Sequence, residues 1–237
     1  MSRATQLQAT LWQEMAQPDK ADLLSTGYAE LDALLPGGGW VRGELVEILL
    51  SPDSLGAMRL VMPALVQLSS EKRWLSWVSP PSLPSVSALA TAGVRLSCIQ
   101  LVRPKHYQDS LEIVEKSLIS GQCSAVLAWP MFDDAAILSG LQRSAACSDA
   151  LAFMFRRAEE TQPASPAGLR LRLESRSHGN LAVSVLDQSG AVTAGPVSLV
   201  GKPVLPAGTV RRGLTPRGHN SRLHSARPQR MSCLYCR

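Results

Sequence analysis

This sequence has no long apolar run, no signal-peptide-like start and no evident cysteine framework. No apolar stretch approaches the roughly 20 residues that a membrane-spanning helix needs, and residues 1–17 lack the basic start and apolar block of a signal peptide. The cysteines number five, which is an odd count. Cys98, Cys123 and Cys147 fall in apolar patterns that are typical of buried side chains. We therefore expect a protein of the reducing cytoplasm, without disulfides or membrane contact.

Acidic residues are also missing from the last part of the chain, after Asp187. Of the 24 Lys and Arg residues, eight follow residue 190, which leaves 16 basic residues against 19 acidic residues before it. The net charge of +5 therefore divides into about −3 for the body and +8 for the tail. Hydrophobic periodicity fades in the same part of the chain. Residues 191–237 are thus predicted to form a basic, disordered tail.

The tail carries six spaced arginines, namely Arg211, Arg212, Arg217, Arg222, Arg227 and Arg230. Arginines without acidic neighbours attract phosphate groups, and such binding weakens as salt is added. These arginines are candidates for weak, non-specific contact with DNA or for contact with an acidic surface of a partner. The alternative is a solubilising end of the chain. Cys233 and Cys236, with His219 and His224 upstream, do not match a known zinc arrangement, so we predict no metal site.

Apolar segments of strand length alternate with amphipathic segments of helix length through most of the body. The predicted strands are 43–50, 74–78, 98–102, 125–129 and 151–155, and the predicted helices are 56–69, 83–92, 108–120 and 135–147. This alternation is typical of a parallel sheet with helices on both faces. Residues 169–174 and 181–186 predict a β-hairpin at the sheet edge. The chain thus divides into an N-terminal helix in 1–20, a core domain in 21–190 and the tail in 191–237.

The strand at 43–50 leads into a segment that resembles a phosphate-binding loop without its chemistry. A nucleotide-binding loop has Gly, four residues and then Gly-Lys-Ser/Thr. The lysine supplies charge for the phosphate, and the hydroxyl binds Mg²⁺. Here Ser51 replaces the first glycine, Ala57 the lysine and Met58 the hydroxyl residue, and only Gly56 is kept. A degenerate, inactive nucleotide-binding loop is therefore predicted at Ser51, Pro52, Asp53, Ser54 and Gly56.

An ATPase also needs an acidic ligand for Mg²⁺, usually at the end of a buried strand. The strand at 125–129 ends in Trp129 and Pro130 instead. Asp133 and Asp134 come too late for this role and could cap the next helix. We therefore expect no enzymatic activity and no cofactor, although backbone N–H groups after Gly56 could bind an anion weakly.

The tryptophans offer a possible surface for stacking on nucleic-acid bases. Trp77 and Trp129 lie on strands that helices would cover, so packing in the core is the preferred interpretation. Trp40 precedes the strand at 43–50 on a glycine-rich turn, and both a surface contact and core packing are open for it.

Short motifs before the loop occur in the order found in recombinases like RecA. They are Ser25-Thr26-Gly27, Leu31-Asp32, Gly38-Gly39, Arg42-Gly43 and Glu47-Ile48. Together with the broken loop and the later motifs at 73–81, 101–104 and 125–130, they make the chain resemble the ImuA family over roughly residues 21–187. The resemblance implies a RecA-like three-layer α/β domain of the P-loop type, with a mostly parallel central sheet.

Members of the ImuA family are accessory factors of error-prone translesion synthesis in the bacterial DNA-damage (SOS) response. The resemblance therefore implies a pseudo-ATPase that acts as an adaptor in mutagenesis and DNA repair. Its implied partners are an ImuB-type protein, a DnaE2-type polymerase and, as a further candidate, RecA. Residues 73–156 also resemble the cell-division inhibitor SulA, which binds FtsZ and lacks the approach at 25–43. An active RecA-like ATPase is a third alternative, which the missing lysine disfavours.

Overall fold

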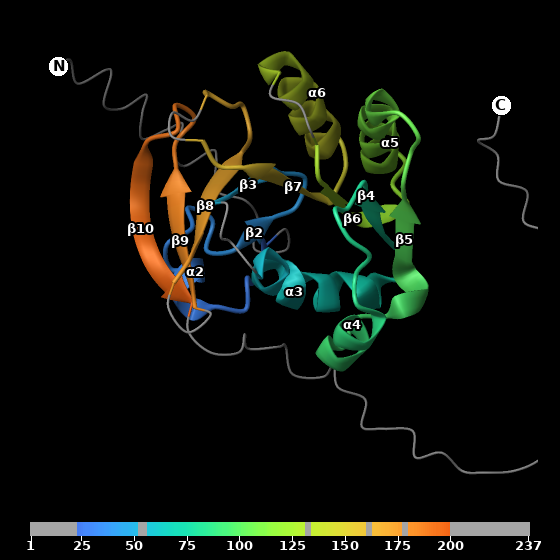
Figure 1. The fold of residues 1–237 in the computed structure, drawn as a ribbon, viewed down its shortest axis with the longest axis horizontal. Helices are drawn as coiled ribbons and strands as arrows, with labels where there is room; N and C mark the ends of the chain where they lie inside the picture. The colour runs from blue at the N-terminus through green and yellow to red at the C-terminus, as the bar shows by residue number, and fades with distance from the viewer. Residues whose placement is uncertain (1–22, 52–55, 131–133, 160–162, 177–179, 200–237) are drawn as a thin grey trace, which may run out of the picture.

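The computed structural model describes residues 23–51, 56–130, 134–159, 163–176 and 180–199. These residues build a central β-sheet with helices on both faces (Figure 1). The helix predicted within residues 1–20 and the arginines of the tail lie outside the described residues. The described residues thus cover most of the predicted core domain and the first residues of the predicted tail, up to residue 199.

Within the described residues, the central sheet has eight strands in the order β10-β9-β8-β3-β7-β6-β4-β5. Six of them pair in parallel: β3 (Leu45–Leu50), β4 (Trp74–Val78), β5 (Ile99–Val102), β6 (Cys123–Ala128), β7 (Leu151–Arg157) and β8 (Leu169–Ser175). The last two, β9 (Leu181–Leu186) and β10 (Val192–Leu199), run antiparallel to their neighbours. The predicted α/β fold with a mostly parallel sheet is confirmed.

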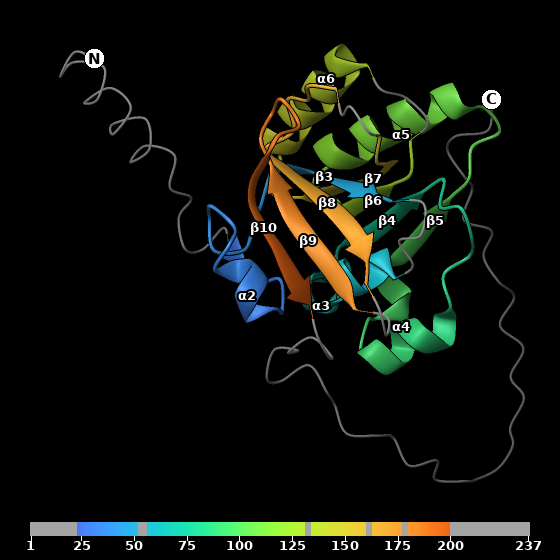
Figure 2. The ribbon, with the colours of Figure 1, turned by 60° about the vertical axis from the view of Figure 1, so that its left-hand side comes forward.

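Four main helices cover the sheet, two on each face (Figure 1, Figure 2). They are α3 (Ala57–Leu68) and α4 (Val86–Ala92) on one face, and α5 (Tyr107–Ile119) and α6 (Ala135–Ala146) on the other. A strand between two helical layers must be apolar on both sides, which explains the apolar runs of β3 and β6. Two apolar clusters result. Leu65 and Phe153 belong to the cluster under α3, and Val114 and Met154 belong to the cluster under α5 and α6.

The segment before β3 forms a small ordered unit of its own. β1 (Leu23–Leu24) pairs with β2 (Trp40–Val41), and the short α2 (Ala29–Asp32) lies between them. Asp32 fixes the turn before α2, because its carboxylate accepts hydrogen bonds from Ser25 Oγ at 2.7 Å and from Thr26 N at 2.8 Å. Trp40 is fully buried and meets the Phe153 ring edge-on at 5.3 Å. The surface interpretation of Trp40 is therefore wrong.

The structure corrects three further predictions. The hairpin of β8 and β9 is formed as predicted, but it is not at the sheet edge, because β10 pairs with β9 and takes that position. The strand β10 lies in the segment that the sequence places in the tail, and the tail from residue 200 lies outside the described residues. Cys98 and Cys123 are buried, but Cys147 is exposed because it caps the end of α6.

Candidate functional site at the carboxyl edge of the sheet

The segment predicted to be a degenerate phosphate loop joins the end of β3 to the start of α3. Ser51 N donates a hydrogen bond to the carbonyl oxygen of Leu173 at 3.2 Å, which ties the start of the loop to β8. Gly56 precedes α3 with φ of 94°, a left-handed conformation that glycine adopts without strain. Pro52, Asp53 and Ser54 lie outside the described residues. The structure therefore places only the two ends of the predicted site.

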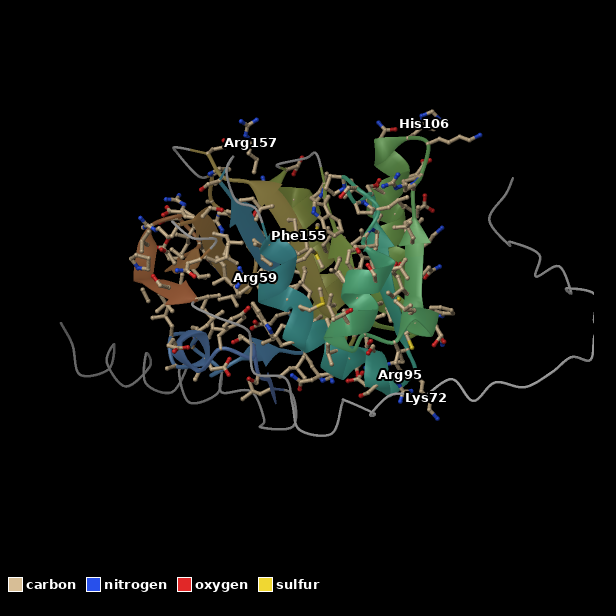
Figure 3. The ribbon with its side chains drawn as sticks, turned by 60° about the horizontal axis from the view of Figure 1, so that its bottom comes forward. Arg59, Lys72, Arg95, His106, Phe155 and Arg157 are labelled. Carbon is tan, nitrogen blue, oxygen red and sulfur yellow. The ribbon has the colours of Figure 1, made fainter. Side chains whose placement is uncertain are left out.

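The first turn of α3 serves packing where a nucleotide-binding protein would bind phosphate. Ala57 and Met58, at the lysine and hydroxyl positions, are partly buried and pack against the cluster under α3. The next residue, Arg59, accepts a hydrogen bond on its carbonyl oxygen from the Tyr28 hydroxyl at 3.1 Å. Figure 3 shows the Arg59 side chain at the side of α3. The segment before β3 is thus fastened to the helix that follows the loop.

An aromatic stack fills the position where a Mg²⁺ ligand would be expected. Trp129 follows β6, and its ring stacks on Phe155 of β7 at 4.7 Å with an interplanar angle of 12°. On its other side it stacks on Trp77 of β4 at 5.8 Å. Trp77 and Trp129 pack with the core, as the sequence predicts. The end of β6 is therefore built for apolar contact rather than for metal coordination.

A small hollow lies beside this stack. The volume open to a water-sized sphere is about 10 Å³, and the hollow is lined by Val78, Ser79, Ser110, Val114, Ala128, Trp129, Pro130 and Met154. Ser79 Oγ and Ser110 Oγ lie 2.9 Å apart and satisfy each other. Small-molecule sites are usually larger, about 300 Å³ or more, and carry polar groups that face the ligand. The hollow has neither the size nor the charge that a nucleotide needs.

Acidic side chains near this edge have structural partners. Asp134 caps α6 by accepting hydrogen bonds from Ala136 N at 2.7 Å and from Ile137 N at 3.4 Å, as proposed from the sequence. Asp133 lies outside the described residues.

Within the described ranges, no group of three or more His, Cys, Asp or Glu side chains is placed to hold a metal ion. None of the helices in these ranges combines the length and apolar character needed to span a lipid bilayer.

A buried ion network lies on the α6 side of the sheet, next to the loop strand. Glu47 of β3 is fully buried. Its carboxylate accepts hydrogen bonds from Arg156 of β7 and, at 2.6 Å, from Arg170 Nε of β8. Sequence reasoning missed this network. A charged residue within an apolar strand was the available signal, because a fully buried carboxylate requires a cationic partner.

Arg170 uses its remaining donors on backbone carbonyls. Its two terminal nitrogens donate to the carbonyl oxygens of Pro163 at 2.9 Å, Asp187 at 3.1 Å and Gln188 at 3.0 Å. One side chain thus joins β3, the segment before β8 and the turn after β9.

A second buried carboxylate lies near this network. Burial raises the pKa of Glu44, which lies against Gly168.

The comparisons with known proteins concern the middle of the chain. Residues 43–151 match the family model described as "Cell division inhibitor SulA". The cell division inhibitors SulA of Yersinia pestis (strain Pestoides F) and Yersinia pseudotuberculosis serotype O:1b (strain IP 31758) are each 29% identical over 135 residues. That alignment covers 56% of this chain and 79% of each relative.

The matched residues run from just before β3 to the first residue of β7. They include the segment between β3 and α3, the aromatic Trp77 and Trp129, and the strand β5 at one sheet edge. The segment from β1 to β2 and the strands β8 to β10 lie outside the match, and the ImuA resemblance rests on sequence motifs alone. The middle of this chain, from β3 to the start of β7, is therefore similar to the SulA family of cell-division inhibitors.

Proposed function

We propose that this protein is a SulA-like inhibitor of cell division in the bacterial DNA-damage (SOS) response. It acts by binding the tubulin-like division protein FtsZ. The observation that carries the proposal is the family match over residues 43–151, together with the 29% identity to SulA proteins. The matched part contains the helices α3 to α6 and the parallel strands β3 to β6. These elements form the framework on which a SulA-like surface would lie.

The proposed action is stoichiometric binding without catalysis. Three features support this view. The lysine and hydroxyl positions of the loop hold Ala57 and Met58, which pack inward. The position after β6 holds Trp129 in an aromatic stack. Phosphoryl transfer depends almost entirely on positioned charge, and these residues supply none. An inhibitor that binds one protein needs only a stable surface.

A second candidate is the ImuA-type adaptor, which would assemble with an ImuB-type protein and a DnaE2-type polymerase. The segment before residue 43, which the SulA match does not include, favours it. Leu31, Leu35 and Trp40 of that segment are buried in the cluster under α3, and Asp32 holds its turn. β8 also lies beside β3 in parallel, so the sheet extends well past the matched region. Both additions support a RecA-like framework larger than a SulA domain.

Overproduction in bacterial cells separates the two candidates. The SulA-type function predicts filamentous cells, co-purification of FtsZ and reduced sedimentation of FtsZ polymers by the purified protein. Normal division, with FtsZ polymers unaffected at equimolar protein, would overturn that proposal. Recovery of an ImuB-type protein instead, with loss of damage-induced mutagenesis on deletion of the gene, would establish the second candidate.

A further inference from the structure

The strand β5 leaves one edge of the sheet open. Among the described strands, only β4 pairs with β5, and it does so on one side (Figure 1). The backbone groups that face the other side therefore lack a ladder partner from the described sheet. Gln100 and Leu101 are exposed, and Leu101 has 40% of its surface accessible. A sheet edge with free N–H and C=O groups is a template for another strand.

The opposite edge, β10, is protected against such pairing. Two register shifts interrupt its pairing with β9, and the strand contains Gly195 and Pro196. Gly195 has φ of 96°, and a Cβ there would lie 2.8 Å from the Val183 carbonyl oxygen, so the irregularity requires glycine. Bulges and proline are common devices that keep edge strands from pairing. The pairing of β4 with β5 is regular along its whole length, so β5 has neither device.

Cations flank β5 at both ends. Arg95 precedes the strand, and Arg103 and Lys105 follow it, and all three side chains are exposed. Residues 93–108 contain no Asp or Glu. Arg95, Arg103 and Lys105 make no salt bridge with another described residue. Arg103 donates one hydrogen bond, to the Pro80 carbonyl oxygen at 3.3 Å. Figure 3 shows Arg95 and His106 at opposite ends of this edge.

We propose that the β5 edge binds an extended acidic segment of a partner protein, which adds to the sheet as a further strand. Backbone hydrogen bonds would hold the segment, and Arg95, Arg103 and Lys105 would select for acidic residues near its ends. Charge disfavours two other occupants. A second β5 edge would bring two sets of cations together, and the tail of this chain is itself basic. The proposal goes beyond the proposed function and does not depend on which protein the partner is.

The test uses the full chain and three short fluorescent peptides that share a Val-Thr-Ile-Thr centre. The first has two acidic residues at each end. The second has lysines there, and the third keeps the acidic ends but has prolines in the centre, which cannot form a ladder. We expect fluorescence anisotropy to detect binding of the first peptide only. We also expect slower amide hydrogen exchange at residues 99–102 when that peptide is bound.

Charge reversal locates the binding surface. Arg103→Glu with Lys105→Glu should weaken binding of the acidic peptide by about tenfold or more, since two favourable contacts become repulsive. Arg143→Glu with Arg157→Glu is the matched control, because it makes the same change in net charge at exposed residues on α6 and β7. The control variant should bind the peptide as the unchanged protein does.

Four results would overturn the proposal. One is equal binding of the proline peptide, which would mean charge attraction without strand addition. Another is equal weakening by both double variants. The third is no binding of the acidic peptide at any concentration up to the solubility limit. A dimer in sedimentation experiments that excess acidic peptide does not dissociate, with residues 99–102 protected from exchange, would instead assign the edge to a second copy.

Discussion

Glu47 and Arg170 form a buried ion pair in which Oε2 of Glu47 lies 2.6 Å from Nε of Arg170, although 123 residues separate them in the chain. Glu47 lies in the part that matches the SulA family, and Arg170 lies outside it. The pair therefore joins the family-like part to the C-terminal strands. Because Arg170 also holds three backbone carbonyls, its loss would release several contacts at once.

Removing Arg170 should destabilise the protein strongly. Arg170→Ala leaves Glu47 with one of its two cationic partners in the interior, and breaking a buried pair in this way typically costs about 3–5 kcal/mol. Arg176→Ala is the control, because its pair with Glu174 is exposed and should contribute about 0–1 kcal/mol. Urea unfolding followed by circular dichroism measures both. Similar losses in the two variants would show that the buried network does not hold the strands together.

The pH dependence of stability should report Glu44. Burial raises the pKa of Glu44 in the folded state. The folded protein therefore binds more protons than the unfolded chain between the ordinary pKa of about 4.3 and the raised pKa, and stability falls as the pH rises through that window. Glu44→Gln should raise the melting temperature at neutral pH, with the difference vanishing below about pH 4. Glu30→Gln, at an exposed residue of α2, is the control and should leave the melting temperature at neutral pH nearly unchanged.

Purified protein should not release phosphate from ATP, with or without single-stranded DNA. Ala57→Lys with Met58→Thr restores two loop residues but should not produce an efficient ATPase, because Trp129 and Pro130 still occupy the place of the acidic ligand. A phosphate-release assay on repurified protein measures this. DNA-stimulated release by the unchanged protein that Gly56→Pro abolishes would contradict the expectation.

The tail should give the protein weak affinity for single-stranded DNA. Six arginines that meet phosphates would give a slope of up to ~5 in a plot of log affinity against log salt. The body, at about −3, should not bind DNA by itself at moderate salt. Anisotropy of a labelled oligonucleotide, with the full chain and with a chain that ends at residue 200, tests this at two salt concentrations. Equal binding by both would move the DNA contact to the folded body.

Local pattern was sufficient to predict the strands from β3 to β7, because each is a short apolar run between helices with one apolar face. It failed at β10, where Gly195 and Pro196 are typical of a turn but pairing with β9 imposes a strand. It also missed the partners of Glu47, because a charge within an apolar strand indicates that a partner exists but not which distant residue it is.

At the candidate site, local pattern predicts a loop without the lysine, hydroxyl and acidic ligand of a nucleotide-binding site, and this stays a prediction. It did not identify what replaces them. The stack of Trp77, Trp129 and Phe155 draws one ring from each of β4, β7 and the end of β6. These rings meet only because the strand order places β6 between β4 and β7. The order of strands is a property of the whole chain, and the sequence pattern of each segment does not contain it.

The two edges of the sheet, β5 and β10, lie at opposite ends of the strand order, and only β5 is open to a further strand. Seven strand spacings separate them, which is roughly 34 Å along the ladder direction. Leu199, the last described residue, ends β10. A strand bound at β5 would therefore lie far from the β10 edge, with six strands of the sheet between them. The sheet would act as a spacer that keeps a partner at β5 apart from the irregular β10 edge.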